Sequence, residues 1–236
     1  MMAEARIGKE FYDSSDYFEG GTEHLTDMES PFQQYRVSKV LDIHDPAPGD
    51  RVADLGCGWG TFGFVLADRV AEVVGIDFSE KSVSICDKRL AANPHDNLRF
   101  LCADAGDTGL EDGQFDVVIA ADLFEHLYPD DSVRVAAEAF RLLRPGGHFS
   151  TWTPHRGHVL EALKNRDIIL KRDISHVDYK SMARMKTLLT DAGFEIERAY
   201  YAASHLPVLR TAERLLQGAV PFLRRRIAVL GRRPGG

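Results

Sequence analysis

Alternating glycines after an apolar run are the part of this sequence best suited to hold a ligand. Gly56, Gly58 and Gly60 come directly after the apolar run 51–55, and a helical pattern follows from 61 to 70. This order predicts a buried strand, a tight turn and a helix. Glycine allows positive φ angles and close approach of a ligand, while the helix start presents unpaired N–H groups. The stretch therefore predicts a site for a nucleotide-like ligand, although loop packing alone can also explain such glycines.

Asp54 indicates the charge of that ligand. The turn reads Asp-x-Gly-x-Gly-x-Gly, which differs from the Gly-x-Gly-x-x-Gly of dinucleotide-binding proteins. In those proteins the helix start faces a pyrophosphate, so a carboxylate at the end of the strand would repel the ligand. Asp54 therefore favours a cationic ligand.

Acidic residues also follow the next apolar runs. Asp77 follows the run 72–76 and is placed to accept both hydroxyls of a ribose. Asp104 follows the run 98–102, where a carboxylate can accept an exocyclic adenine N–H. Because open parallel sheets bind ligands at the carboxyl ends of their strands, these acids are expected to line one site.

Together these features resemble the class I S-adenosylmethionine-dependent methyltransferases. The resemblance rests on the glycine motif, Asp77, Asp104, the Phe-Asp-Val-Val strand and the Arg-Pro-Gly-Gly turn, all in the expected order. It spans roughly residues 30 to 200. It implies S-adenosyl-L-methionine as the cofactor.

Within that family, the chain is nearest in motif to small-molecule O-methyltransferases of the ubiquinone-biosynthesis type. This narrower resemblance rests on Asp122-Leu-Phe-Glu125-His126-Leu, on Ser150-Thr-Trp-Thr-Pro-His-Arg and on Ile-Ser-His176-Val-Asp.

The cofactor is expected to lie over the carboxyl ends of the strands. Arg36, on a helix that begins after the N-cap Ser30, would pair with the carboxylate of the bound amino acid, as an N-terminal arginine is thought to do in the relatives. A solvated surface arginine is the alternative. The residues expected to hold the cofactor are Arg36, Asp54, Gly56, Gly58, Gly60, Asp77, Phe78, Asp104, Ala105 and Ala121.

His126 is the candidate catalytic base. A phenol or sugar hydroxyl must lose its proton as its oxygen attacks a methyl group, and imidazole titrates in the useful pH range. His126 lies just past the apolar run 115–120, on the same edge as the glycine turn. The alternative is a residue at a helix start that satisfies backbone groups. His155, His158 and His176 are secondary candidates for substrate contact.

Asp122, Glu125 and His126 are candidate ligands of a divalent metal such as magnesium. If a helix begins there, the three project from one turn and could hold an ion that orients and acidifies a catechol-like substrate. In the resembling ubiquinone O-methyltransferases, the corresponding acid-x-x-Glu-His has been assigned that role. Here Asp122 replaces the usual Glu, and many relatives carry Glu-His without a metal.

The alternation of strand and helix patterns predicts an α/β fold. We expect a Rossmann-like, seven-stranded, mostly parallel sheet with helices on both faces and an antiparallel C-terminal hairpin. In the helix 129–143, the residues expected to face the sheet are Val133, Ala136, Ala137, Phe140 and Leu143. A single methyltransferase domain, 1–236, would comprise an N-terminal cap (1–29), a cofactor-binding core (30–153), a substrate lid (154–180) and C-terminal helices with the hairpin (181–236).

Composition and charge bound the partners of this chain. A chain of 236 residues with 44% hydrophobic and 28% charged residues is typical of a soluble globular protein, and the net charge of −7 argues against nucleic acid. We expect no membrane span and a cytoplasmic location. Residues 206–236 hold seven arginines and one glutamate, which could touch an anionic surface or substrate. The simpler expectation is that these arginines are exposed at the ends of a last strand, 225–232. The sequence leaves the oligomeric state open.

The expected function is methyl transfer from S-adenosylmethionine to a hydroxyl of a small metabolite or natural product. N- or C-methylation of a small metabolite is the nearest alternative. A nucleotide-cofactor oxidoreductase is a second, and Asp54 and Asp104 speak against it. A module that binds the cofactor without turnover is a third.

Overall fold

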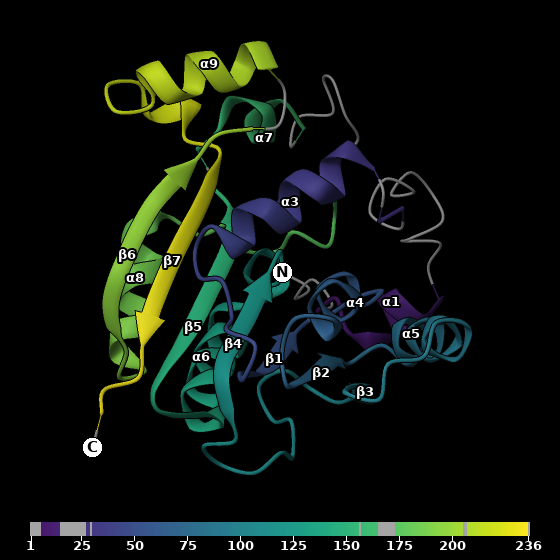
Figure 1. Ribbon diagram of the computed structural model, residues 1–236. Helices are drawn as coiled ribbons and strands as arrows, with labels where there is room; N and C mark the ends of the chain where they lie inside the picture. The colour runs from purple at the N-terminus through teal and green to yellow at the C-terminus, as the bar shows by residue number, and fades with distance from the viewer. Residues whose placement is uncertain are drawn as a thin grey trace.

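The computed structural model describes residues 6–14, 27–28, 30–155, 157–164, 173–204 and 207–235. Within them, seven strands form one sheet in the order β3-β2-β1-β4-β5-β7-β6 (Figure 1). The strands are β1 Arg51–Leu55, β2 Glu72–Asp77, β3 Leu98–Cys102, β4 Phe115–Ala121, β5 Leu143–Pro154, β6 Glu195–Ala202 and β7 Arg226–Arg232.

The first five strands are parallel to one another, and β7 is antiparallel to both β5 and β6. This arrangement confirms the predicted mostly parallel sheet with an antiparallel C-terminal hairpin. It also places the start of β7, rather than its end, at the edge where β4 and β5 finish, since Pro154 pairs with Arg226.

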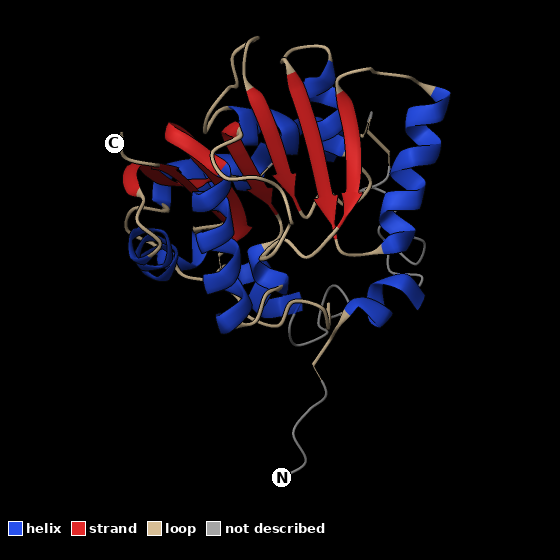
Figure 2. Ribbon diagram, turned by 90° about the horizontal axis from the view of Figure 1, so that it is seen from below, coloured by secondary structure: helices blue, strands red, loops and turns tan. Residues whose placement is uncertain are grey.

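Helices cover both faces of the sheet (Figure 2). They are α1 Lys9–Ser14, α3 Pro31–Leu41, α4 Thr61–Ala67, α5 Glu80–Ala92, α6 Pro129–Leu142, α7 Val159–Lys164, α8 Met182–Asp191 and α9 Pro207–Leu216, with the short 3-10 helices η1 Phe124–His126 and η2 Pro221–Leu223.

Successive residues of each strand point to opposite faces, which gives the sheet two apolar cores. Ala53 and Leu55 of β1 pack in the core that includes residues of α6 and α8. Val52 packs in the other core, with residues of α3 and α4. Asp54 has the same parity as Val52 and so belongs to the α3 and α4 face. The central strands are buried on both faces, which is why they read as short apolar runs.

Local sequence signals set the helix starts as expected. Ser30 caps α3 by accepting a hydrogen bond from the Gln33 N–H at 3.3 Å, with Pro31 at the first helical position. Ser79 caps α5 in the same way, through the Ser82 N–H at 3.2 Å. Both caps fix helices that border the carboxyl edge of the sheet.

The expectation for α6 was right for Ala136 and Leu143, which are buried, and wrong for Val133 and Ala137. Val133 is 58% exposed and Ala137 is also exposed. The buried stripe instead runs through Val135, Ala136 and Ala139 to Leu142. With 3.6 residues per turn, Val135 and Leu142 lie on one side of the helix and Val133 lies on the opposite side. The sequence offers an apolar face on either side, and tertiary packing buries the face that contains Val135 and Leu142.

No helix in the described parts of the chain is long and apolar enough to cross a membrane. Figure 1 shows α3 lying across the ends of β4 and β5, so this helix borders the edge at which the predicted site residues gather.

Candidate functional site

The glycine turn after β1 has the backbone that the motif predicted. Gly56, Gly58 and Gly60 all have positive φ angles, of 72°, 55° and 79°. A Cβ at Gly56 would come within 2.8 Å of Leu123, whereas a Cβ at Gly58 would meet open space among the described residues. Gly60 is the N-cap of α4. The turn thus leaves open space beside Gly58, which suits the close approach of a ligand to the backbone.

Asp77, at the end of β2, braces this turn. Its carboxylate accepts hydrogen bonds from the Gly58 N–H at 2.9 Å and from the Ser79 N–H at 3.0 Å. Burial raises the pKa of Asp77 to about 6, and the two backbone N–H groups oppose that rise. The expected ribose-binding carboxylate therefore connects the glycine turn with the start of α5. Phe78, the next residue, is 37% exposed.

Asp54 is buried beneath the turn with unsatisfied hydrogen-bonding capacity. Its Oδ2 atom accepts no hydrogen bond within the described structure. Burial raises the pKa of Asp54 to about 7, while the positive charge of Arg36 opposes the rise. An unpaired buried carboxylate is unfavourable until a donor or a positive charge reaches it. The geometry therefore suits the cationic ligand that the sequence favoured.

Asp104 lies at the outer part of the same edge and is already paired. It accepts a hydrogen bond from Arg134 at 2.8 Å and one from the Gly106 N–H at 2.7 Å. Ala105 is partly buried beside it. The side chains of Asp104 and Arg134 are both about half exposed in this ion pair, and contact of Asp104 with an adenine remains a prediction.

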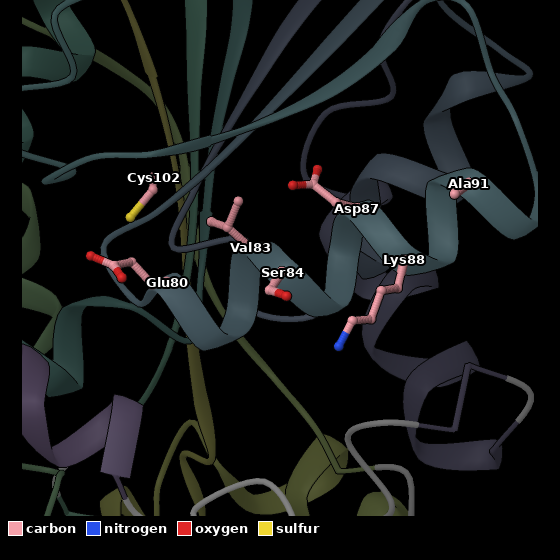
Figure 3. A pocket seen from close by; sticks show the side chains of 7 residues that line it. All are labelled: Glu80, Val83, Ser84, Asp87, Lys88, Ala91 and Cys102. Atoms are coloured by element: carbon pink, nitrogen blue, oxygen red, sulfur yellow. The ribbon is translucent and has the colours of Figure 1, made fainter.

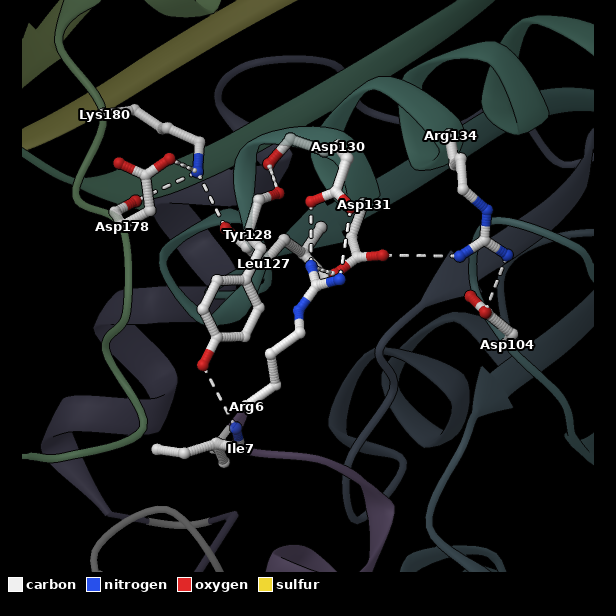
Figure 4. A network of polar contacts seen from close by, with 11 residues as sticks. Arg6, Ile7, Asp104, Leu127, Tyr128, Asp130, Asp131, Arg134, Asp178 and Lys180 are labelled. Atoms are coloured by element: carbon white, nitrogen blue, oxygen red, sulfur yellow. Dashed lines mark hydrogen bonds and ion pairs between the residues drawn. The ribbon is translucent and has the colours of Figure 1, made fainter. Parts of the chain in front are cut away.

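The described part of the expected N-terminal cap docks beside Asp104. Arg6 lies between Asp130 and Asp131 at the start of α6, and Arg134 links Asp131 with Asp104 (Figure 4). Tyr128 also accepts a hydrogen bond from the Ile7 N–H at 3.1 Å. Residues 15–26 of the cap, including Tyr17 and Phe18, lie outside the described residues.

Asp122 does not join the expected metal-ligand set. It accepts hydrogen bonds from Arg36 at 2.7 Å and from Arg226 at 2.6 Å, so each carboxylate oxygen faces a guanidinium. Burial alone would raise its pKa, but the charges of Arg226 and Arg36 outweigh burial and lower it to about 2. Arg36 also donates to the Ala121 carbonyl at 2.9 Å. Asp122 is ionised but already neutralised by two arginines.

Arg226 corrects a second expectation. Its side chain is 15% exposed and paired with Asp122, rather than exposed at a strand end. The antiparallel course of β7 causes this difference, because it brings the start of the strand beside the end of β4. Arg226 is thus a site residue that the sequence analysis did not find.

Glu125 and His126 meet His176 instead of Asp122. Among the described residues, these three are the group whose potential metal-ligating atoms all lie within 4.8 Å of one another. Glu125 is buried, accepts a hydrogen bond from Thr153 at 2.9 Å, and has its pKa raised to about 8 by burial and by the charge of Asp122. This group shares Glu125 and His126 with the expected magnesium site and has His176 in place of Asp122, so the ligand set expected from the sequence is wrong at Asp122.

His126 lies in η1, directly beyond β4. Its Nδ1 atom is 3.2 Å from the Ser175 carbonyl oxygen and 3.2 Å from the Tyr12 hydroxyl. A protonated Nδ1 would donate to the Ser175 carbonyl, and an unprotonated Nδ1 would accept a hydrogen bond from the Tyr12 hydroxyl. The rings of His126 and His176 pack edge to face, with centroids 4.8 Å apart. The site thus fixes the imidazole ring through contacts at Nδ1.

His176, the nearest of the secondary candidates, continues this polar chain. Its Nδ1 atom is 2.7 Å from the Tyr179 hydroxyl, which donates to Glu161 at 3.1 Å. His155 and His158 are buried elsewhere: His155 packs against Tyr201, and His158 Nε2 is 3.1 Å from Glu213. The structure therefore brings one of the three secondary histidines beside His126.

Lys180 locks the segment that carries His126, and sequence reasoning did not single it out. Its buried ammonium donates to the carbonyl groups of Phe124, Leu127 and Asp178, at 2.9, 3.1 and 3.0 Å, and to the Asp178 carboxylate at 2.9 Å (Figure 4). Burial lowers the pKa of Lys180, and the pairing with Asp178 opposes that change. One side chain thus ties η1 to the last residues of the expected lid.

Replacing Lys180 by methionine should lower the free energy of unfolding by about 2–4 kcal/mol, because buried carbonyl groups lose their donor. Urea denaturation measures this change. Lys186→Met, at an exposed position of α8, is the matched control and should change stability by less than about 0.5 kcal/mol. Equal stabilities of the two variants would contradict the locking role.

An open recess lies away from these residues, along the outer side of α5. It is lined from Glu80 to Ala91 on that helix and by Cys102 at the end of β3 (Figure 3). Asp54, Asp77 and His126 are not among its lining residues. The recess along α5 is therefore separate from the site formed by Asp54, Asp77 and His126.

The chain is similar to known proteins in sequence. The family described as "methyltransferase domain" matches residues 52–147. A ubiquinone biosynthesis O-methyltransferase of Thiobacillus denitrificans is 31% identical over 163 residues, which are 66% of this chain and 69% of the relative. A protein of Mycolicibacterium smegmatis, named as a probable S-adenosylmethionine-dependent methyltransferase, is 33% identical over 166 residues, which are 70% of this chain but 60% of the relative.

The fold is also shared with solved structures. A chain from the complex between the Haloferax volcanii Trm112 methyltransferase activator and a methyltransferase matches with a TM-score of 0.69. The match covers 94% of this chain and 97% of that chain, at 21% identity. At that identity the likeness concerns the fold alone.

Proposed function

The chain belongs to the class I S-adenosylmethionine-dependent methyltransferases, and from this we propose that it methylates a hydroxyl group of a small molecule. The observation that carries the choice of a hydroxyl is the placement of His126, an imidazole that can accept a proton, beyond the end of β4. The resemblance to a ubiquinone biosynthesis O-methyltransferase supports the same choice.

The residues at the carboxyl edge fit the cofactor. S-adenosylmethionine supplies a methyl group on a positively charged sulfur. The unsatisfied Oδ2 of Asp54 suits a positive charge, and the open space at Gly58 suits close approach of a ligand to the backbone. Asp77 would accept the ribose hydroxyls, and Phe78 would lie beside the adenine, with Asp104 and Ala105 beyond it.

His126 would receive the proton of the acceptor hydroxyl at Nε2 as the hydroxyl oxygen attacks the methyl carbon. Ser175 and Tyr12 contact the ring at Nδ1, so the ring keeps its orientation. Tyr12, on α1, flanks the ring from the expected cap, and Ser175 flanks it from the expected lid. Orientation of the reactants and exclusion of water can together supply on the order of 7–11 kcal/mol of the acceleration.

The alternatives differ in what they require of His126. Methylation of an amine that is already neutral needs less help from a base, so His126 would have a smaller role in N-methylation. C-methylation would use the base on an activated carbon acid and remains the nearer alternative. The family assignment argues against an oxidoreductase with a nucleotide cofactor.

Methyl transfer from labelled S-adenosylmethionine to a panel of small acceptors tests the proposal. The panel should pair each phenol or alcohol with the corresponding amine and with its already methylated ether. Labelled product from the hydroxyl compounds, and none from their ethers, is expected. Transfer to the amines alone would overturn O-methylation, and tight cofactor binding without any transfer would favour a binding module.

The affinity for S-adenosylmethionine should rise with pH and then level off above about pH 8. Because burial raises the pKa of Asp54 to about 7, this carboxyl is mostly protonated at pH 5.5 and ionised at pH 8. Only the ionised form attracts a cation, so a gain of at least about tenfold is expected across this range. Calorimetric titrations at several pH values measure it.

Asp54→Asn separates this effect from other titrations, including that of Asp77. The variant should bind more weakly at pH 8 and lose most of the pH dependence. An affinity of the unmodified protein that is constant or falls over the same pH range would contradict the role of Asp54.

A further inference from the structure

The helix α9 turns an apolar side toward solvent. Val208 is 87% exposed, Leu215 is 78% exposed, and Leu216 at the end of the helix is exposed as well. Seven residues are almost two turns of an α-helix, so Val208 and Leu215 lie on the same side. Phe222, in the neighbouring η2, is also exposed. We call the surface that carries these four side chains the α9 surface. It holds more than half of the large exposed apolar side chains of the described residues.

Glu213 holds α9 in this orientation. It is fully buried, and it lies two residues before Leu215, on the opposite side of the helix. One of its carboxylate oxygens is 3.1 Å from His158 Nε2, and the other accepts a hydrogen bond from the Ser204 N–H. A rotation of α9 that buried Leu215 would remove both contacts from a buried carboxylate, which is costly. The apolar side of α9 is therefore kept outside.

The exposed charge of this segment is positive. Residues 206–236 hold seven arginines and one glutamate, and that glutamate is the buried Glu213. Arg214 is exposed next to the apolar side of α9. Neither Arg210 nor Arg214 forms an ion pair or a side-chain hydrogen bond with any described residue. Because the whole chain has a net charge of −7, this positive end belongs to an otherwise acidic molecule.

The α9 surface lies at the carboxyl edge of the sheet. The helix is inserted between the end of β6 and the start of β7, where Ala202 pairs with Arg226. Arg226 also pairs with Pro154, at the end of β5. Figure 1 shows α9 beyond these strand ends. A body that binds the α9 surface would therefore lie near the edge that holds the proposed site.

We propose that the α9 surface binds an anionic lipid bilayer. An exposed apolar helix side flanked by arginines is typical of helices that lie in the plane of a membrane, with apolar side chains among the acyl chains and arginines at the headgroups. The acidic remainder of the chain would be repelled by the same bilayer, which favours approach by this end. This inference does not depend on the proposed function.

A second copy of this chain is the other candidate for the α9 surface. A two-fold contact would place the same surface of both copies together, so the arginines of one copy would face those of the other. Like charges that meet in an interface are unfavourable. The charge of the segment therefore favours the anionic bilayer.

The test is co-flotation of the full chain with vesicles of phosphatidylglycerol or of phosphatidylcholine. Partitioning onto phosphatidylglycerol should be about 10- to 100-fold stronger at low salt and should fall as salt screens the arginines. Val208→Asn combined with Leu215→Asn should weaken it about tenfold or more, because two apolar side chains no longer enter the bilayer. Val133→Asn, at an exposed apolar position of α6, is the matched control and should leave partitioning unchanged.

The contribution of charge is measured separately. Arg210→Gln combined with Arg214→Gln should lower the preference for phosphatidylglycerol about tenfold or more. Arg232→Gln, at the other end of β7, is the control and should keep the preference. Thermal denaturation checks that each variant is folded.

Three results would overturn the proposal. Equal partitioning onto the two lipids, or none onto either, would exclude an anionic bilayer as the partner. Partitioning that is unchanged in Val208→Asn with Leu215→Asn would place the contact elsewhere on the chain. A dimer in analytical ultracentrifugation that the same double variant abolishes would assign the α9 surface to a second copy.

Discussion

Replacing His126 by alanine is expected to lower kcat for a hydroxyl acceptor by about 100- to 10,000-fold, the usual contribution of a positioned base. The affinity for S-adenosylmethionine should change little, because the ring lies beyond β4 and not in the glycine turn. The structural basis is the position of His126 in η1, directly beyond β4, where the Ser175 carbonyl and the Tyr12 hydroxyl contact Nδ1. Steady-state kinetics with the best acceptor of the panel, together with calorimetry for the cofactor, measure the two effects.

The pH dependence of His126→Ala provides a second check. The remaining rate should increase as pH rises toward the acceptor's own pKa, since ionised acceptor no longer needs a base. His95→Ala is a suitable control, because His95 precedes β3 and lies at the opposite edge of the sheet. An unchanged kcat in His126→Ala would exclude this residue as the base and return it to a structural role at the start of α6.

Replacing Asp77 by alanine is expected to weaken cofactor binding by about 100-fold or more. Two ribose hydroxyls would lose charge-assisted hydrogen bonds, each worth about 1.5–3 kcal/mol, and about 1.4 kcal/mol corresponds to a tenfold change. The Gly58 and Ser79 N–H groups would also lose their acceptor, so the glycine turn would be less well held. Calorimetry with the cofactor and with its demethylated form measures the loss.

Two further variants separate the ribose contact from the support of the turn. Asp77→Asn retains an acceptor for one of the two backbone N–H groups, which bind different oxygens of Asp77, and it has no charge. It should therefore bind the cofactor more tightly than Asp77→Ala and more weakly than the unmodified protein. Asp96→Ala, at an exposed position before β3, is the control. Cofactor affinity unchanged in Asp77→Ala would remove Asp77 from the ribose role.

The arginine pair on Asp122 explains why this acid cannot be assigned from its spacing to Glu125 and His126. Asp122 has a φ of 56°, a conformation that non-glycine residues seldom adopt, and two guanidinium groups hold it there. In this conformation its carboxylate faces α3 and β7. The three-and-one spacing suggested a common direction because it assumed a regular helix from Asp122, whereas η1 begins at Phe124.

The sequence by itself determined the order of the elements, the parallel part of the sheet and the edge at which the site lies. Three of these features are local sequence patterns: the glycine turn, the short apolar runs and the acids that follow the runs. Because parallel strands end at the same edge of a sheet, these patterns predict that the acids lie in one site. The caps at Ser30 and Ser79 were readable for the same reason, since a cap and its helix lie within four residues of one another.

Only the tertiary structure decided which side chains meet at that edge. Arg226 and Asp122 are 104 residues apart in sequence, Tyr12 and His126 are 114 apart, and Lys180 and Phe124 are 56 apart. No local period connects such pairs. They meet because β7 runs antiparallel beside β5, because α1 packs near α5, and because the segment 173–180 returns to η1. Burial then decides the chemistry of the edge, since it leaves Asp54 in need of a partner that the described chain does not supply.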